Sequence, residues 1–211
     1  MSITRTTGLA LVLLVASATA AAQTYVGASL GQSSTSFKSG DYALGLPNVA
    51  ESQDKTDGAG KLFAGYAFNR TWAVEGGYAD LGKPAVKYTG IGPLAGVSGQ
   101  AEVRESAWFV AGKGTLALTD AFNVFGKLGV TWNKAKLNAS SNNAAFNAAA
   151  GLPLSASKSS TDALVGLGVG YNLGKQTELR FEYEDFGKFG DQNQTGRTRA
   201  TLWSLGLAYR F

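Results

Sequence analysis

The chain has 211 residues, which is enough for one domain or at most two. It contains neither cysteine nor histidine, which excludes disulfides and thiol chemistry and removes the commonest general base and metal ligand. The formal net charge is +4 and the basic residues are scattered along the chain, so we expect no nucleic-acid partner.

Residues 1–22 have the pattern of a secretory signal peptide. Arg5 is the only charged side chain ahead of the apolar run 8–16, and small residues lead to Ala22. We therefore predict cleavage after Ala22 and export of residues 23–211 as a single barrel domain. The alternative is an uncleaved membrane anchor, for which the apolar run is short.

After this segment, apolar residues alternate with small or polar ones in eight stretches of the chain. A period of two predicts β-strands whose two faces meet different environments. None of these stretches has the ~20 continuous apolar residues of a membrane helix. The predicted strands are residues 25–31, 59–68, 71–81, 101–118, 122–132, 161–171, 177–186 and 201–211.

The connections between these strands alternate between long and short along the whole chain. We expect the long ones to be loops, and they are residues 32–58, 82–100, 133–160 and 187–199. This alternation is typical of outer-membrane barrels, which have short periplasmic turns and long external loops. The sequence therefore predicts an all-β fold, an eight-stranded antiparallel up-and-down transmembrane β-barrel in the bacterial outer membrane.

The last strand shows the two faces most clearly. Its apolar face carries aromatic side chains near both ends, and its other face is small apart from Arg210. Between Trp203 and Phe211 a tilted strand climbs about 20 Å, close to the ~25 Å apolar band of such barrels. We interpret three side chains as a C-terminal signature for the barrel-assembly machinery: Trp203, Tyr209 and Phe211.

Alternation alone does not say which face lies inside the barrel. The small residues of the polar faces suit a crowded eight-stranded interior. The aromatic residues of the apolar faces form two belts, as at the two surfaces of a membrane. They are Phe68, Trp72, Phe122, Tyr171, Tyr209 and Phe211 near the short turns, and Trp108, Trp132 and Trp203 toward the long loops. The inverted alternative is a soluble, lipocalin-like barrel with a ligand inside.

With the apolar faces outside, the inward faces place both signs of charge in the lumen. These residues are Lys61, Glu75, Glu105, Lys113, Lys127, Arg180, Glu182, Glu184 and Arg210. Paired charges would fill the barrel as a plug, and the alternative is a gate or selectivity ring for ions. Eight strands leave little open channel, which favours the plug. Arg104 lies on the apolar face, so its section either stands clear of the bilayer or contains a bulge.

Three segments resemble the OmpA-like transmembrane domain of Gram-negative outer membranes. They are KLFAGYAFNRTWAVEGGYADLGK (61–83), ELRFEYEDFGKFG (178–190) and SLGLAYRF (204–211). The resemblance implies an eight-stranded barrel with a charge network in its lumen. It also implies that four residues occupy charged lumen positions of that domain: Glu75, Lys113, Lys127 and Arg180.

The chain departs from this family's pattern at two lumen positions. Ser29 and Gly170 stand where the best-known member has a lysine and a glutamate. A gate that works by exchanging ion-pair partners is therefore not implied here. The peptidoglycan-binding domain of that member does not follow Phe211 in this sequence, so the resemblance does not imply cell-wall anchoring.

These features favour a non-enzymatic integral outer-membrane protein with a structural role in the envelope and at most a narrow pore. We expect contact with outer-membrane lipid and lipopolysaccharide. One alternative is a surface receptor or adhesin that binds an external ligand through the four long loops. An enzyme is disfavoured, because no histidine is present to activate a serine or a water, and we expect no cofactor or metal.

Overall fold

The computed structural model describes residues 23–37, 49–144, 147, 154–191 and 196–211. The predicted signal peptide, residues 1–22, lies outside the described residues, so its cleavage stays a prediction. The described strands are β1 (Gln23–Phe37), β2 (Val49–Asp54), β3 (Thr56–Ala67), β4 (Trp72–Asp80), β5 (Ala85–Gly90), β6 (Ser98–Ala117), β7 (Phe122–Ser141), β8 (Leu154–Asn172), β9 (Thr177–Asp191) and β10 (Gly196–Arg210). A short 3₁₀ helix, η1 (Gly92–Leu94), follows β5.

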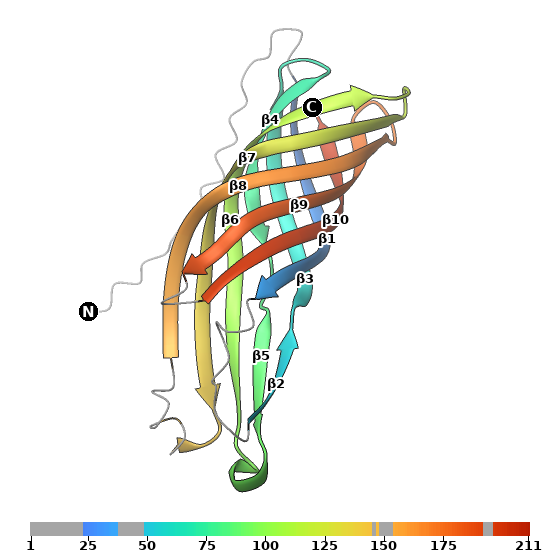
Figure 1. The fold of residues 1–211 in the computed structure, drawn as a ribbon. Helices are drawn as coiled ribbons and strands as arrows, with labels where there is room; N and C mark the ends of the chain where they lie inside the picture. Colours follow the sequence, from blue (N-terminus) through green and yellow to red (C-terminus); the bar gives the residue numbers. More distant parts are fainter. Residues whose placement is uncertain (1–22, 38–48, 145–146, 148–153, 192–195) are drawn as a thin grey trace, which may run out of the picture.

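Eight of these strands form a closed antiparallel barrel (Figure 1). In order around the barrel they are β1, β3, β4, β6, β7, β8, β9 and β10, with β10 returning to pair with β1. Because the ring is closed, every barrel strand pairs on both sides. The prediction of an eight-stranded antiparallel barrel is therefore confirmed.

The three short connections are tight turns, and side-chain acceptors stabilise two of them. In the β3–β4 turn, Asn69 Oδ1 accepts hydrogen bonds from the backbone N–H groups of Thr71 and Trp72, both at 2.8 Å. In the β6–β7 turn, Thr119 Oγ1 accepts one from the backbone N–H of Phe122 at 2.9 Å. Asn and Thr stabilise turns in this way. These turns lie at the same end of the barrel as the carboxyl terminus (Figure 1).

The prediction that the four long connections are loops is wrong for much of their length. Most of 133–160 is strand, because β7 continues to Ser141 and β8 begins at Leu154. The stretches 32–58 and 82–100 contain β2 and β5, which pair with each other, and β5 also pairs with β6. Part of 187–199 lies in β9 and β10.

The error in 133–160 has a physical reason. Outside the bilayer a strand no longer needs an apolar outward face, so its polarity inverts while its backbone pairing continues. Beyond Trp132, β7 buries Ala135 and Leu137 and exposes Lys134 and Lys136. The composition of this segment, rich in Asn, Ala and Ser, therefore led to the prediction of a loop where β7 continues as a regular strand.

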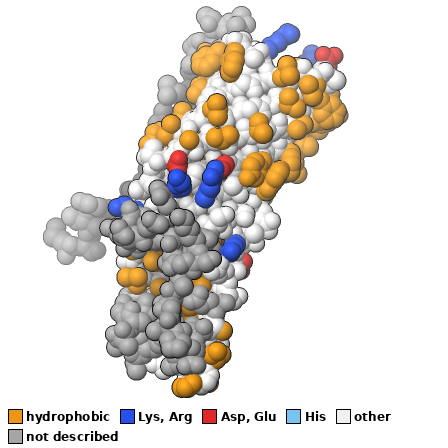
Figure 2. Space-filling view, viewed as in Figure 1, with side chains coloured by type: hydrophobic (Ala, Val, Ile, Leu, Met, Phe, Trp, Pro, Cys, Tyr) orange, Lys and Arg blue, Asp and Glu red, His pale blue; other side chains and the backbone are white. Residues whose placement is uncertain are grey.

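The large apolar side chains of the barrel strands point outward and form a continuous band. Figure 2 shows them gathered over the part of the molecule that holds the short turns, with basic and acidic side chains at the edge of that region. The exposed set includes Leu30, Leu62, Trp72, Trp108, Leu128, Trp132, Leu167, Trp203, Leu205 and Phe211. The inverted, lipocalin-like arrangement is therefore not adopted.

Arg104 lies outside this band. The register between β6 and β7 runs from Gly99 to Ala117 without a shift, so β6 has no bulge against β7. The exposed Arg104 side chain donates a hydrogen bond to Asp80 Oδ2 at 2.7 Å. Of the two alternatives for this section, the structure adopts the one that stands clear of the bilayer.

A bulge does occur in β9, where Gly187 makes a close approach to β8. Gly187 has φ +71°, and a Cβ at this position would lie 2.6 Å from Asp162. Asp162 is held there by its Oδ2, which accepts a hydrogen bond from the backbone N–H of Lys188 at 2.8 Å. The register between β9 and β10 shifts at this point. Both the backbone conformation and the space therefore require glycine.

Leu128 tests the position of the membrane band. Its side chain is 70% exposed near the middle of the β7 apolar stretch, so Leu128→Arg should lower the free energy of unfolding by about 2–4 kcal/mol. The control is Leu154→Arg, which places the same change on an exposed leucine beyond the band and should have little effect. Urea-induced unfolding in lipid vesicles measures both, and equal losses would contradict the proposed band.

Gly187 tests the bulge. Gly187→Ala should lower the free energy of unfolding by about 2 kcal/mol, because the new methyl group is strained by φ and collides with Asp162. Gly174→Ala is the control, since a Cβ there meets nothing within 4 Å, and it should change stability by less than about 0.5 kcal/mol. Unfolding midpoints in urea, read by tryptophan fluorescence, compare the two.

Candidate functional site

The lumen holds a compact network of charged side chains at its centre. The barrel brings together residues that the sequence spreads over six strands, and nearly all of them are buried. The members are Lys61, Glu75, Lys113, Lys127, Glu178, Arg180, Glu182, Glu184 and Arg210. Of the predicted lumen residues, only Glu105 lies apart from this network.

Glu75 on β4 is the hub of the network. Its Oε1 accepts hydrogen bonds from Arg180 Nη2 and from the Tyr25 hydroxyl, each at 2.7 Å. Lys127 Nζ lies 2.8 Å from its Oε2, and Lys113 Nζ lies 3.7 Å from its Oε1. These partners come from β1, β6, β7 and β9, so one carboxylate links strands on opposite sides of the barrel.

Two carboxylates of β9 complete the centre of the network. Lys127 Nζ donates to Glu182 Oε2 at 2.5 Å and to Glu184 Oε1 at 3.1 Å. Lys61 Nζ donates to Glu182 Oε2 at 2.7 Å and also to Glu184. Two ammonium groups therefore bridge two carboxylates, and the hydrogen bonds offset much of the cost of burying four charges.

Aromatic rings line the network. The guanidinium carbon of Arg180 lies 4.9 Å from the centre of the Phe63 ring and 4.6 Å from that of Phe125. Lys113 Nζ lies 4.6 Å from the Phe125 ring centre. The Phe125 ring occupies the space beside Gly168, where a Cβ would lie 2.3 Å from the ring. A small residue on one strand thus makes room for a ring that contacts cations.

Glu178, a member of the network, and Tyr25, whose hydroxyl binds Glu75, were not among the predicted site residues. Glu178 Oε2 accepts a hydrogen bond from Arg210 Nη2 at 3.0 Å, and its Oε1 accepts one from Asn123 Nδ2 at 2.9 Å. Tyr25 shares the inward parity of Gly27 and Ser29 on β1, and Glu178 shares that of Arg180 and Glu182 on β9. This parity could have predicted that both side chains lie in the lumen. It could not have predicted that Tyr25 reaches Glu75.

An apolar layer lies between this network and the end with the long connections. The rings of Phe109 and Phe186 meet edge-on, with their centres 6.2 Å apart. On the inward face of β6, Phe109 stands between Lys113 and Glu105. The layer also includes Leu81, Leu164, Phe189, Ala200 and Leu202, all fully buried. This layer separates the charged network from the part of the lumen at that end.

Glu105 is buried beside this apolar layer, farther from the charged network than Phe109 is. Its Oε2 accepts a hydrogen bond from Thr35 Oγ1 at 2.9 Å, and its Oε1 accepts one from Thr198. Among the described residues it forms no ion pair, so the expectation that each lumen charge meets an opposite charge does not hold for it. Two threonine hydroxyls provide the hydrogen bonds instead.

The lumen opens at the end with the short turns. A polar cavity of about 680 Å³ extends from these turns to Lys113, Glu178 and Arg210. Arg210 is partly exposed there, with 32% of its side chain accessible. Solvent can therefore reach one side of the charged network, whereas the apolar layer covers the other side.

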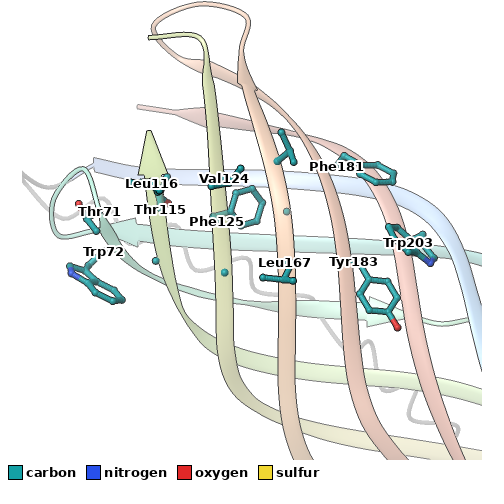
Figure 3. Close-up of a pocket in the computed structure, with 14 residues that line it drawn as sticks. Thr71, Trp72, Thr115, Leu116, Val124, Phe125, Leu167, Phe181, Tyr183 and Trp203 are labelled. Carbon is teal, nitrogen blue, oxygen red and sulfur yellow. The ribbon is translucent and has the colours of Figure 1, made fainter. Parts of the chain in front are cut away.

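A second hollow, of about 740 Å³, lies on the outer apolar surface (Figure 3). Its lining includes Trp72, Leu116, Leu167, Phe181 and Trp203, whose side chains are all exposed. The hollow is continuous with the outward band, so it faces lipid.

In the part of the chain that the structure describes, no helix is long and apolar enough to cross a membrane, and no acidic cluster could hold a metal ion.

A comparison with protein families matches the OmpA-like transmembrane domain to residues 19–211. The chain belongs to this family. The family assignment and the outer-membrane location predicted from the sequence are thereby confirmed. The chain is a bacterial outer-membrane β-barrel.

The relatives agree with this assignment. The chain is 29% identical over 192 residues to outer membrane protein A of Serratia marcescens, covering 89% of this chain and 49% of the relative, so it spans about half of that protein. The crystal structure of OprG from Pseudomonas aeruginosa is similar with a TM-score of 0.51 and 16% identity, covering 91% of this chain and 96% of OprG. The crystal structure of Ail from Yersinia pestis, solved with the heparin analogue sucrose octasulfate, has a TM-score of 0.47 and 19% identity. The match covers 90% of this chain and 99% of Ail. At 16% identity the OprG structure shows the fold alone.

Glu75 tests the network. Glu75→Gln removes the charge that faces Lys127 and Arg180 and leaves buried cations in excess, so the free energy of unfolding should fall by about 3 kcal/mol. The control is Glu102→Gln, since Glu102 is only half-buried and is in no ion pair among the described residues. Urea unfolding in detergent micelles compares the two variants, and equal stabilities would contradict a central role for Glu75.

Proposed function

We propose that the protein is a non-enzymatic outer-membrane barrel with a structural role in the envelope and a lumen that is closed to solutes. The observation that carries this proposal is the apolar layer around Phe109 and Phe186, which lies directly beside the charged network. A hydrated ion would have to pass both. The eight-stranded barrel has little interior space to spare for such a path.

The charged network supports a plug rather than a selectivity ring. A ring that selects ions presents charges of one sign to a water-filled path. Here each central carboxylate is bound by at least two cations, as Glu75 and Glu182 are. The opposite charges pair and tie the strands together, which suits a rigid barrel.

The absence of histidine and the bonding of the carboxylates support a non-enzymatic role. General acid–base catalysis needs a titratable group that can reach a substrate. The buried glutamates of β9 instead bind Lys61, Lys127 and Arg180. We therefore assign no catalytic residue to this lumen.

The orientation in the membrane belongs to the same proposal. We place the short turns on the periplasmic side and the strand extensions outside the cell, as in other outer-membrane barrels. The C-terminal side chains Trp203, Tyr209 and Phe211 face outward on the last strand. We propose that they are accessible to the barrel-assembly machinery during insertion.

Conductance in planar lipid bilayers tests the closed lumen. We expect no large, steady conductance from the folded protein. The double variant Phe109→Ala/Phe186→Ala removes the two facing rings of the apolar layer and should produce steps several-fold above any wild-type signal. Phe181→Ala is the control, because its ring points outward and its loss should open nothing.

Heat-modifiable migration on a gel confirms that each variant is folded before it is recorded. A large porin-like conductance from the unaltered protein would overturn the proposal of a closed barrel.

A further inference from the structure

An outward-facing pocket of about 320 Å³ lies just beyond the apolar band, on β4, β6 and β7. It combines aromatic rings with basic side chains, and the functions considered above do not use it. Its lining residues are Tyr78, Arg104, Ser106, Trp108, Trp132, Lys134 and Lys136.

The register of β6 and β7 orders this pocket in successive pairs of facing residues. Trp108 faces Trp132, and two residues farther from the membrane Ser106 faces Lys134. The next pair on the same face is Arg104 and Lys136. Neighbouring pairs are about 5 Å apart along the barrel axis, given ~3.3 Å per residue and a tilt of ~40°. The cations therefore lie about 5–10 Å beyond the two tryptophans.

This depth is where lipid headgroups lie. Tryptophan side chains in membrane proteins gather at the interface between hydrocarbon and water. Trp108 and Trp132 mark that interface on this face of the barrel, because Val110 and Val130 continue the apolar band on one side of them and Lys134 begins the basic group on the other. A cation one or two pairs farther out meets the phosphates of the leaflet.

The pocket has more positive charge than its own neighbours neutralise. Arg104 and Lys136 face each other directly, and like charges at this spacing are destabilising. Asp80 accepts a hydrogen bond from Arg104 and raises the pKa of the guanidinium above its ordinary value. Among the described residues, neither Lys134 nor Lys136 is in an ion pair, and neither is Glu102, the next acidic residue outward on β6. Asp80 is therefore the one paired carboxylate described beside three cations, Arg104, Lys134 and Lys136.

We propose that this pocket binds the phosphorylated headgroup of a glycolipid in the outer leaflet. The phosphate group lies among Arg104, Lys134 and Lys136, with the Ser106 hydroxyl in reach, and the acyl chains run beside Trp108 and Trp132. A phosphomonoester carries about −1.5 to −2 charges, which matches the uncompensated charge of the pocket, whereas a phosphodiester carries one. The inference rests on the proposed orientation, in which this end of the barrel is outside the cell.

The test is lipid retention by the purified, folded protein in detergent, measured by native mass spectrometry. The probes are lipid A with its phosphates, the same lipid dephosphorylated, phosphatidylglycerol and inorganic phosphate. We expect the double variant Lys134→Gln/Lys136→Gln to bind phosphorylated lipid A about tenfold more weakly, and to bind the dephosphorylated lipid as the unaltered protein does. The control, Lys87→Gln/Lys175→Gln, removes the same charge from exposed positions outside the pocket and should keep the affinity.

Three other outcomes would each overturn the inference. Equal losses in the two double variants would mean that net charge alone attracts the lipid. Equal retention of phosphatidylglycerol would remove the preference for a phosphomonoester, and displacement of lipid A by millimolar inorganic phosphate would make free phosphate the ligand. The unaltered protein alone answers these last two points, so they do not depend on the folding of a variant. A large conductance would overturn the closed barrel and leave the binding result standing.

Discussion

The structure depends on one constraint: hydrocarbon offers no hydrogen-bond partners, so every polar group at membrane depth must be satisfied inside the protein. Pairing of β10 with β1, together with the long β6–β7 ladder, closes the backbone hydrogen bonds into a ring. For the same reason, the charged side chains at the level of the outer apolar band point into the lumen. Once inside a narrow barrel they can be stable only beside opposite charges or hydroxyl groups, and this requirement decides what the lumen can be.

The lumen satisfies that requirement in layers. At the end with the short turns a polar cavity reaches Arg210 and Glu178, and the network around Glu75 follows. The ring pair of Phe109 and Phe186 then separates the network from a buried carboxylate, Glu105, which threonine hydroxyls satisfy. In the closed barrel that we propose, the charges that tie the strands together also block the lumen, together with the rings beside them.

The outer surface changes character where the bilayer ends. Up to Trp108 and Trp132 the strands expose large apolar side chains, and beyond them the same alternation exposes Arg104, Lys134 and Lys136 while apolar residues turn inward. Backbone pairing does not change at this boundary. The strands therefore continue as a sheet outside the membrane, and the boundary itself creates a pocket with rings on one side and cations on the other.

The sequence by itself determined the class of fold, because period-two alternation and alternating connection lengths are local properties that survive without knowledge of contacts. It also determined which charges face inward, since parity along each strand fixes the face. Only the tertiary structure decided which of them meet. Glu75 and Arg180 are 105 residues apart on strands that are not neighbours, and their contact depends on how the closed ring staggers its strands. The extent of β7 and β8 was decided in the same way, because outside hydrocarbon a strand is held by its neighbours' backbone and no longer by an apolar outward face.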